Sequence, residues 1–112
     1  MISVEVLTEE KNWSKKIKKK EIFFYSVCKS FPKKYQFKNK RIFFTLLLSN
    51  NRGIKKLNKK FRKKNKPTDI LSFPFFDKKR LKKNLKNKKI YLGDIVISYE
   101  EFSERNRKNY LE

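Results

Sequence analysis

Hydrophobic and polar positions along the chain predict four strands. Residues 2–6 alternate with a period of two, which indicates a half-buried strand. Residues 42–48 are continuously apolar over a strand's length, which is typical of a strand covered on both faces. Residues 70–73 and 91–97 complete the set. Pro74 cannot donate to a full ladder, so the third strand is expected at a sheet edge or to end in a bulge.

Apolar residues recur at helical spacing in three other segments. Residues 12–31 carry one stripe with lysines mostly off it, and Pro32 ends that helix; the stripe comprises Trp13, Ile17, Phe24, Val27, Cys28 and Phe31. A second helix follows the N-cap candidates of residues 49–51, with Ile54, Leu57 and Phe61 on its apolar face.

A third helix is predicted after a capping box of Ser98 and Glu101, with Tyr99, Phe102 and Tyr110 along it. Residues 77–89 hold eight basic residues and little apolar content, so a mobile cationic loop is expected there. The resulting order, β-α-β-α-β-β-α, predicts an α/β (α+β) fold. We expect a small mixed sheet of about four strands packed with helices, in one domain over residues 1–112.

Charge changes this picture most. The 112 residues include 32 Lys and Arg against 11 Asp and Glu, a formal charge of +21. Such a potential attracts polyanions, and nucleic acid is the leading partner class. The chain also lacks alanine and is rich in Lys, Asn, Ile and Phe, so A/T-rich codon usage accounts for part of the lysine content. Codon usage explains less well why Asp69 and Asp77 are the only acidic residues between Glu21 and Asp94.

The densest basic run extends from Arg52 to Lys66 without an acid. On a helix its lysines form a ridge that can follow a phosphate backbone; the candidates are Lys55, Lys56, Lys59, Lys60, Lys63, Lys64 and Lys66. Arg62 is expected to close the helix, and its planar fork can hold a phosphate by two hydrogen bonds. The alternative for Arg62 is a solvated surface arginine.

Other chemistry is constrained by what the sequence lacks. It has no histidine and a single cysteine, Cys28, so an ordinary zinc site, a Cys-His pair or a Ser-His-Asp triad cannot be built from these residues. Cys28 has no internal disulfide partner and is expected to be a buried structural thiol. Asp69 and Asp94 form a possible hydrolytic carboxylate pair. An Asx-type turn cap for Asp69 and a buried, backbone-bonded role for Asp94 are favoured over it.

Two segments carry a family resemblance. Leu57-Asn58, Phe61-Arg62 and Lys66-Pro67-Thr68-Asp69-Ile70-Leu71-Ser72-Phe73-Pro74, followed by Leu92-Gly93-Asp94-Ile95-Val96-Ile97-Ser98, resemble the bacterial YbeY family of endoribonucleases involved in ribosomal RNA maturation. The resemblance implies that the two apolar segments are neighbouring strands walling an active-site cleft, with Ser72, Phe73, Pro74, Gly93 and Asp94 as the wall. It also implies that Arg62 lies in the cleft and matters for RNA cleavage.

This sequence departs from the family in two places. Family members carry a later helix with three histidines, spaced His-x3-His-x5-His, that binds zinc, whereas this chain contains no ligands of that kind. We therefore expect a YbeY-like domain that is incomplete at its C-terminus and inactive alone. The family also tends to have acids at the start of the second helix, where this chain has Asn50, Asn51, Arg52 and Gly53, and a weakened helix start is expected.

Three hypotheses follow. The first is a metal-dependent, single-strand endoribonuclease acting on ribosomal RNA in the cytoplasm, with the ribosome, and its small subunit in particular, as partner. The second is a non-catalytic RNA- or ribosome-binding module. The third keeps the fold and makes the charge incidental. No apolar run reaches the roughly 20 residues that a membrane span needs, so no membrane partner is expected.

Overall fold

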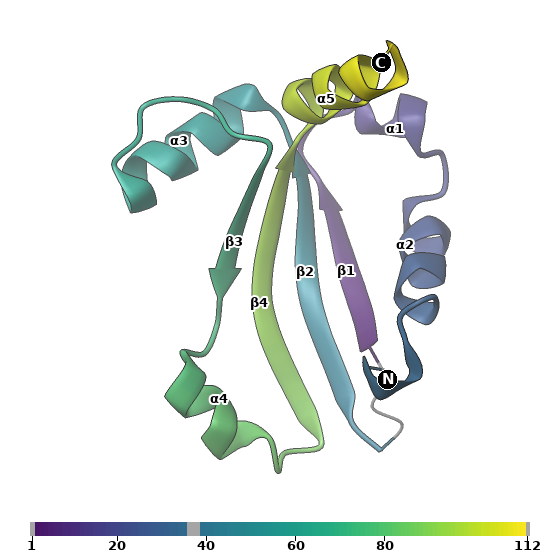
Figure 1. The fold of residues 1–112 in the computed structure, drawn as a ribbon, viewed down its shortest axis with the longest axis vertical. Helices are drawn as coiled ribbons and strands as arrows, with labels where there is room; N and C mark the ends of the chain where they lie inside the picture. The colour runs from purple at the N-terminus through teal and green to yellow at the C-terminus, as the bar shows by residue number, and fades with distance from the viewer. Residues whose placement is uncertain (1, 36–38, 112) are drawn as a thin grey trace.

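A four-stranded mixed sheet forms the centre of the protein, as the computed structural model in Figure 1 shows. The structure describes residues 2–35 and 39–111, without the side chains of 35 and 106–111. The strands are β1 (Ile2–Thr8), β2 (Arg41–Ser49), β3 (Ile70–Pro74) and β4 (Lys89–Ser98), in the order β1-β2-β4-β3. β1 and β4 run parallel to β2, and β3 runs antiparallel to β4. The predicted fold class and the edge position of β3 are confirmed.

The predicted helix over residues 12–31 is wrong in its continuity. It is divided into α1 (Trp13–Lys16) and α2 (Lys20–Lys29), because Ile17 and Lys19 leave the helical region. Lysines in this segment would face one another four residues apart in a continuous helix, and such like-charge pairs are unfavourable. Ile17, directly after α1, packs against the core beside Trp13. Val27 and Phe31 of the predicted stripe remain over one third exposed.

A core lies between one face of the sheet and helices α1, α2 and α5 (Tyr99–Leu111). Trp13 is 2% exposed at its centre, against Leu46 and Leu48 of β2. The indole Nε1–H donates to the Ser49 carbonyl at 2.8 Å, which ties α1 to the end of β2. Cys28 is 3% exposed, so the predicted buried thiol is confirmed, and burial raises its pKa.

Helix α3 (Asn51–Arg62) covers part of the opposite sheet face. Ile54 is fully buried there against Leu71 and Val96. Phe43, Thr45 and Leu47 of β2, on this face, are only half-buried, so the expectation that β2 is covered on both faces is wrong. The radius of gyration is 15.7 Å, above the roughly 13 Å of a compact domain of about this length. The sheet therefore presents an open face.

The start of α3 is well capped, contrary to the expected weakness. The Asn50 side chain accepts from the Gly53 N–H at 2.8 Å, as predicted for this position. The Asn51 N–H donates to the Glu100 carboxylate of α5 at 2.8 Å, so the acid missing from the α3 sequence comes from another helix. Ser98 Oγ donates to Asn51 Oδ1 at 2.6 Å, and Glu101 accepts from the Asn51 amide. Ser98 and Glu101 thus bond to α3 rather than forming the predicted capping box.

The predicted mobile loop over residues 77–89 contains a helix, α4 (Lys78–Asn84). Asp77 is its N-cap, since its side chain accepts from the Arg80 N–H at 2.7 Å. Figure 1 places α3 and α4 at opposite ends of β3. No described helix is long and apolar enough to cross a membrane.

Candidate functional site: a cationic helix beside an apolar cleft

The lysines predicted to bind RNA are all exposed on α3 and the segment that follows it. Ile54 faces the core and Leu57 the sheet, so the lysines of the helix are directed outward. The prediction that Lys63 belongs to a helical ridge of lysines is wrong. The helix ends at Arg62, and Lys63 adopts a left-handed conformation with φ 57°, which turns the chain away from the helix axis.

A buried asparagine fixes this helix end. Asn58 is 1% exposed, and its amide donates to the Lys66 carbonyl at 2.8 Å. The Lys64 N–H donates to the Asn58 carbonyl at 3.2 Å. These bonds hold the turn before Pro67 against the helix, and they set where the exposed Arg62 projects.

The two segments of the resemblance lie side by side. Ser72 pairs with Ile95, Phe73 with Asp94 and Pro74 with Gly93 across the antiparallel β3–β4 ladder. The five residues predicted as cleft wall are therefore brought together at one place in the sheet. Ser72 and Pro74 are exposed, Phe73 is half-buried and Gly93 is buried.

Gly93 makes a bulge in β4. Phe43 pairs with Tyr91 and Thr45 with Asp94, so two residue steps of β2 match three of β4. Gly93 has φ +133°, and a Cβ there would lie 2.3 Å from the Phe73 carbonyl oxygen. Only glycine fits this conformation and this approach of β3.

The bulge places Tyr91 and Asp94 on the same face of the sheet, although side chains three residues apart in a regular strand point to opposite faces. The Tyr91 hydroxyl contacts the Asp94 carboxylate, and it lies 3.1 Å from Thr45 Oγ1. Burial, followed by the Asp94 bond, raises the pKa of Tyr91. The expectation of a buried, backbone-bonded Asp94 is wrong, because this side chain is exposed and bonds to a phenol.

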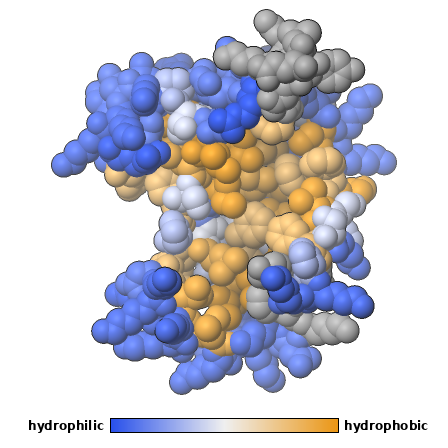
Figure 2. Space-filling view, in the orientation of Figure 1, coloured by the Kyte–Doolittle hydropathy of each residue, from blue (hydrophilic) through white to orange (hydrophobic). Residues whose placement is uncertain are grey.

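An apolar cleft of about 480 Å³ lies between α3 and the sheet. Thr45 and Asp94 are the two polar residues in its wall; the others are Leu7, Leu47, Leu57, Phe61, Phe73 and Val96. Figure 2 shows a band of hydrophobic residues over the sheet, between the hydrophilic surfaces of α3 and α4. Phe73 and Asp94 of the predicted wall thus line the cleft. Arg62 is adjacent in sequence to Phe61, which lines it, but is not itself part of the wall.

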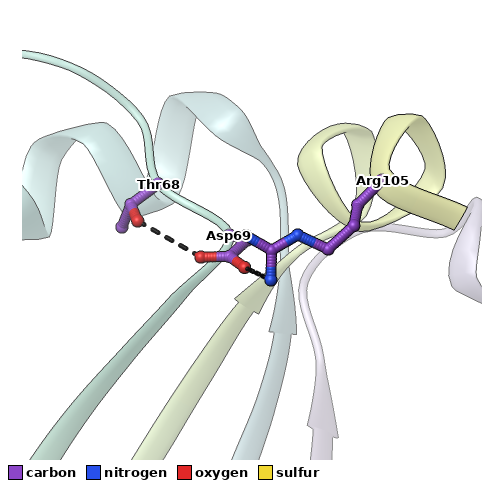
Figure 3. A network of polar contacts seen from close by, with 3 residues as sticks. All are labelled: Thr68, Asp69 and Arg105. Atoms are coloured by element: carbon purple, nitrogen blue, oxygen red, sulfur yellow. Dashed lines mark hydrogen bonds and ion pairs between the residues drawn. The ribbon is translucent and has the colours of Figure 1, made fainter. Parts of the chain in front are cut away.

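Asp69 has a different role from the predicted turn cap. Its carboxylate pairs with Arg105 of α5, Nη1 to Oδ2 at 2.5 Å, and accepts from the Thr68 hydroxyl at 3.4 Å (Figure 3). The Asp69 carbonyl also accepts from the Ser98 N–H at 2.9 Å. Asp69 therefore joins the start of β3 to α5, and the sheet places Asp94 at another point of the β3–β4 ladder. The two aspartates do not form a carboxylate pair.

The zinc that the family resemblance implies does not fit the residues present. Zinc in proteins takes nitrogen and sulfur ligands above all, and the sequence has no histidine. Within residues 2–35 and 39–111 no three or more of His, Cys, Asp and Glu lie close enough to hold a metal ion. The Cys28 thiol of α2 is buried. No catalytic step can be assigned to a metal held by these residues.

Three residues of the site were not foreseen from the sequence: Tyr91, Thr45 and Phe61. The sequence predicts Phe61 on the apolar face of α3, whereas in the structure it lines the cleft and is 57% exposed. A glycine inside a strand is a signal for a bulge, and Gly93 could have indicated that Tyr91 and Asp94 share a face.

Fold and surface together define an α/β domain with a cationic helix bordering an apolar cleft. The sequence model described as endoribonuclease YbeY matches residues 5–111. The chain is 55% identical over its whole length to the endoribonuclease YbeY of Pelagibacter ubique, covering 70% of that protein. It is 36% identical over 103 residues to that of Ehrlichia ruminantium (strain Gardel), matching 92% of this chain and 60% of the relative. It is 37% identical over 105 residues to the endoribonuclease YbeY of Malacoplasma penetrans, and the match covers 90% of this chain and 61% of that relative.

The chain belongs to the endoribonuclease YbeY family, because the family model covers nearly all of it.

Proposed function

We propose that this protein binds single-stranded ribosomal RNA along α3 and serves in its endonucleolytic maturation, in the cytoplasm and in contact with the small ribosomal subunit. The observation that carries the proposal is the acid-free basic run from Arg52 to Lys66, which borders the cleft in a chain of this family. Each lysine contact with a phosphate releases counterions and raises affinity without reading sequence.

Arg62 is proposed to hold a phosphate near the scissile bond. It ends α3 next to Phe61 at the cleft mouth, and the Asn58–Lys66 bond fixes the helix end from which it projects. A guanidinium offers two parallel N–H donors to a phosphate, which lysine cannot reproduce. Ser72, Phe73, Pro74, Gly93 and Asp94 are proposed as the wall against which the RNA lies, with Asp94 as an acceptor for ribose or base hydrogens.

RNA binding along α3 is tested by the salt dependence of affinity for a single-stranded oligonucleotide. Lys59→Ala with Lys63→Ala removes two proposed phosphate contacts. The slope of log K against log salt should become shallower by about 1.4, at roughly 0.7 per contact. Lys15→Ala with Lys18→Ala, exposed on the segment around α1, is the control of equal charge and should keep the wild-type slope. Equal changes in both double variants would refute a specific role for α3.

Because the chain alone is expected to be inactive, cleavage is tested by incubating ribosomal RNA with a full-length product that bears the three-histidine helix, with and without added zinc. If Arg62 clamps a phosphate, Arg62→Ala and Arg62→Lys both abolish cutting while RNA affinity falls little, because one contact of many is lost. Cutting that survives in Arg62→Ala would contradict this role.

A second candidate function is a non-catalytic RNA- or ribosome-binding module. It is favoured because the described residues offer no set of ligands for zinc. This module would bind RNA with the same salt slope and leave it uncut under every metal condition. Binding with a flat salt slope would refute both functions and favour an incidental charge.

A further inference from the structure

A row of four aromatic rings lies at the α4 end of the open sheet face. Phe43 and Tyr91 have centroids 5.1 Å apart, Tyr91 and Phe75 5.5 Å, and Phe75 and Phe76 4.8 Å. The rings come from β2, β4 and the segment after β3. Phe75 remains 60% exposed, so the row is not a closed core beneath α4.

The row borders a hollow of about 240 Å³. Its wall also contains Asn84 and Asn87, the buried Ile90 and the exposed Lys89. Pockets for drug-sized ligands measure roughly 300–1,000 Å³. This smaller hollow, lined by aromatic rings and two asparagines, suits a single planar ring that has polar edges.

Two cations lie beside the Phe43 ring. Arg41 Cζ lies 5.9 Å from the Phe43 centroid and Lys89 Nζ lies 5.4 Å from it, and both side chains are exposed. Helix α4 adds basic residues at the same end of the sheet: Lys78, Lys79, Arg80, Lys82 and Lys83. Exposed aromatic rings within a cationic surface are the features that proteins use to bind single-stranded nucleic acid without sequence preference.

Tyr91 connects this hollow with the cleft beside α3. Its ring lines the hollow, while its hydroxyl contacts Asp94 and Thr45, which line the cleft. Phe43 and Thr45 are successive residues on this face of β2, roughly 7 Å apart along the strand. One nucleic-acid strand can therefore occupy both hollows while its phosphates face α4 at one end and α3 at the other.

A second copy of the chain is a poorer occupant. Each copy carries a formal charge of +21, and both helices beside the open face are basic, so two copies facing each other would repel. A polyanion with flat apolar rings satisfies the charge and the apolar surface together.

We propose that the row Phe43, Tyr91, Phe75 and Phe76 is a stacking platform for a base of single-stranded RNA, with Phe75 as its most accessible ring. Arg41, Lys89 and α4 hold the flanking phosphates. The platform rests on the RNA-binding function proposed above and extends the RNA path from α3 across the sheet to α4.

The test compares two fluorescent probes of equal length and charge: a single-stranded uridine oligonucleotide and an abasic strand with the same phosphates. The wild-type chain should bind the uridine strand more tightly. Phe75→Ala should lower uridine-strand affinity by on the order of tenfold, with an unchanged salt slope and unchanged abasic affinity. Phe75→Trp should keep wild-type affinity, because a larger ring also stacks.

Phe23→Ala is the matched control, since Phe23 of α2 is 49% exposed and outside the row. The platform is refuted if Phe75→Ala binds the uridine strand as tightly as the wild type does. It is also refuted if Phe23→Ala lowers uridine-strand affinity as much as Phe75→Ala does. Equal affinities of the wild-type chain for the uridine and abasic strands would also refute the platform. They would leave intact the proposal that the chain binds RNA through its phosphates. A wild-type chain that binds neither probe refutes the proposed RNA function itself. A dimer in sedimentation that Phe75→Ala dissociates would instead make the row a contact between copies.

Discussion

Replacing Gly93 by alanine tests the bulge on which the cleft geometry depends. The new Cβ would lie 2.3 Å from the Phe73 carbonyl oxygen, 2.8 Å from the Phe75 nitrogen and 2.9 Å from the Pro74 Cα. All three are backbone atoms, so a side-chain rotation cannot relieve the overlap. β3 has to move away from β4, or the bulge has to be lost.

The cost has two parts. Placing a non-glycine residue at φ +133° costs on the order of 1–3 kcal/mol. Displacing β3 would weaken the 2.9 Å hydrogen bond from the Phe75 N–H to the Leu92 carbonyl, and the hydrogen bonds next to it in the β3–β4 ladder. Each hydrogen bond lost costs about 1 kcal/mol of stability. The sum is about 3–5 kcal/mol, a large share of the roughly 5–15 kcal/mol that stabilises a typical domain.

Urea unfolding monitored by Trp13 fluorescence measures this loss, because Trp13 is the only tryptophan and is buried. With a slope of about 1.5 kcal/mol/M, the midpoint should fall by about 2–3 M. Gly53→Ala is the comparison: its Cβ would approach the Ser49 hydroxyl at 2.4 Å, a side-chain atom, and helix propensity favours alanine by about 1 kcal/mol. If the Gly93→Ala midpoint falls by no more than that of Gly53→Ala, the reasoning about the bulge is refuted.

Two further variants test bonds of the fold. Trp13→Phe leaves the buried Ser49 carbonyl without its indole donor and should lower the free energy of unfolding by about 1–3 kcal/mol, measured by circular dichroism in urea; an unchanged midpoint would contradict the role of this bond. Burial and the Asp94 bond raise the pKa of Tyr91 above its usual 10 in the folded state, so its contribution to stability is complete below about pH 10 and declines as pH rises toward the folded pKa, because the unfolded phenol ionises first. The stability difference between wild type and Tyr91→Phe should narrow over that alkaline range, and a constant difference would show that Tyr91 titrates normally.

The strands and α3 could be predicted from the sequence because their signals are local. Alternation over residues 2–6, the Asn50 cap and Pro74 at the end of the edge strand each act within a few residues. Helix α4 was missed because its basic content resembles a loop, although Asp77 three residues before Arg80 is a cap signal. The break between α1 and α2 could not be predicted locally, because residues 17–19 contain neither proline nor glycine.

The site was less predictable because its groups meet through tertiary structure. The resemblance correctly made Ser72–Pro74 and Gly93–Asp94 neighbours, yet periodicity could not show that a bulge joins Tyr91 with Asp94 and Thr45 on the cleft side. Asp69 and Arg105 are likewise far apart in the sequence, and only the packing of α5 beside the start of β3 pairs them.

The high positive charge of this chain, formally +21, is distributed unevenly over the structure. The acids Glu9, Glu10 and Glu100 bond at the start of α3, to Ser49, Asn50 and Asn51. The opposite end of α3 and the whole of α4 carry the basic residues that border the open sheet face. A base-composition bias alone would raise the lysine content everywhere. It does not explain why Glu9, Glu10 and Glu100 gather at the start of α3 while the outer faces of α3 and α4 carry lysine and arginine, so this distribution favours a polyanion as the partner of those two helices.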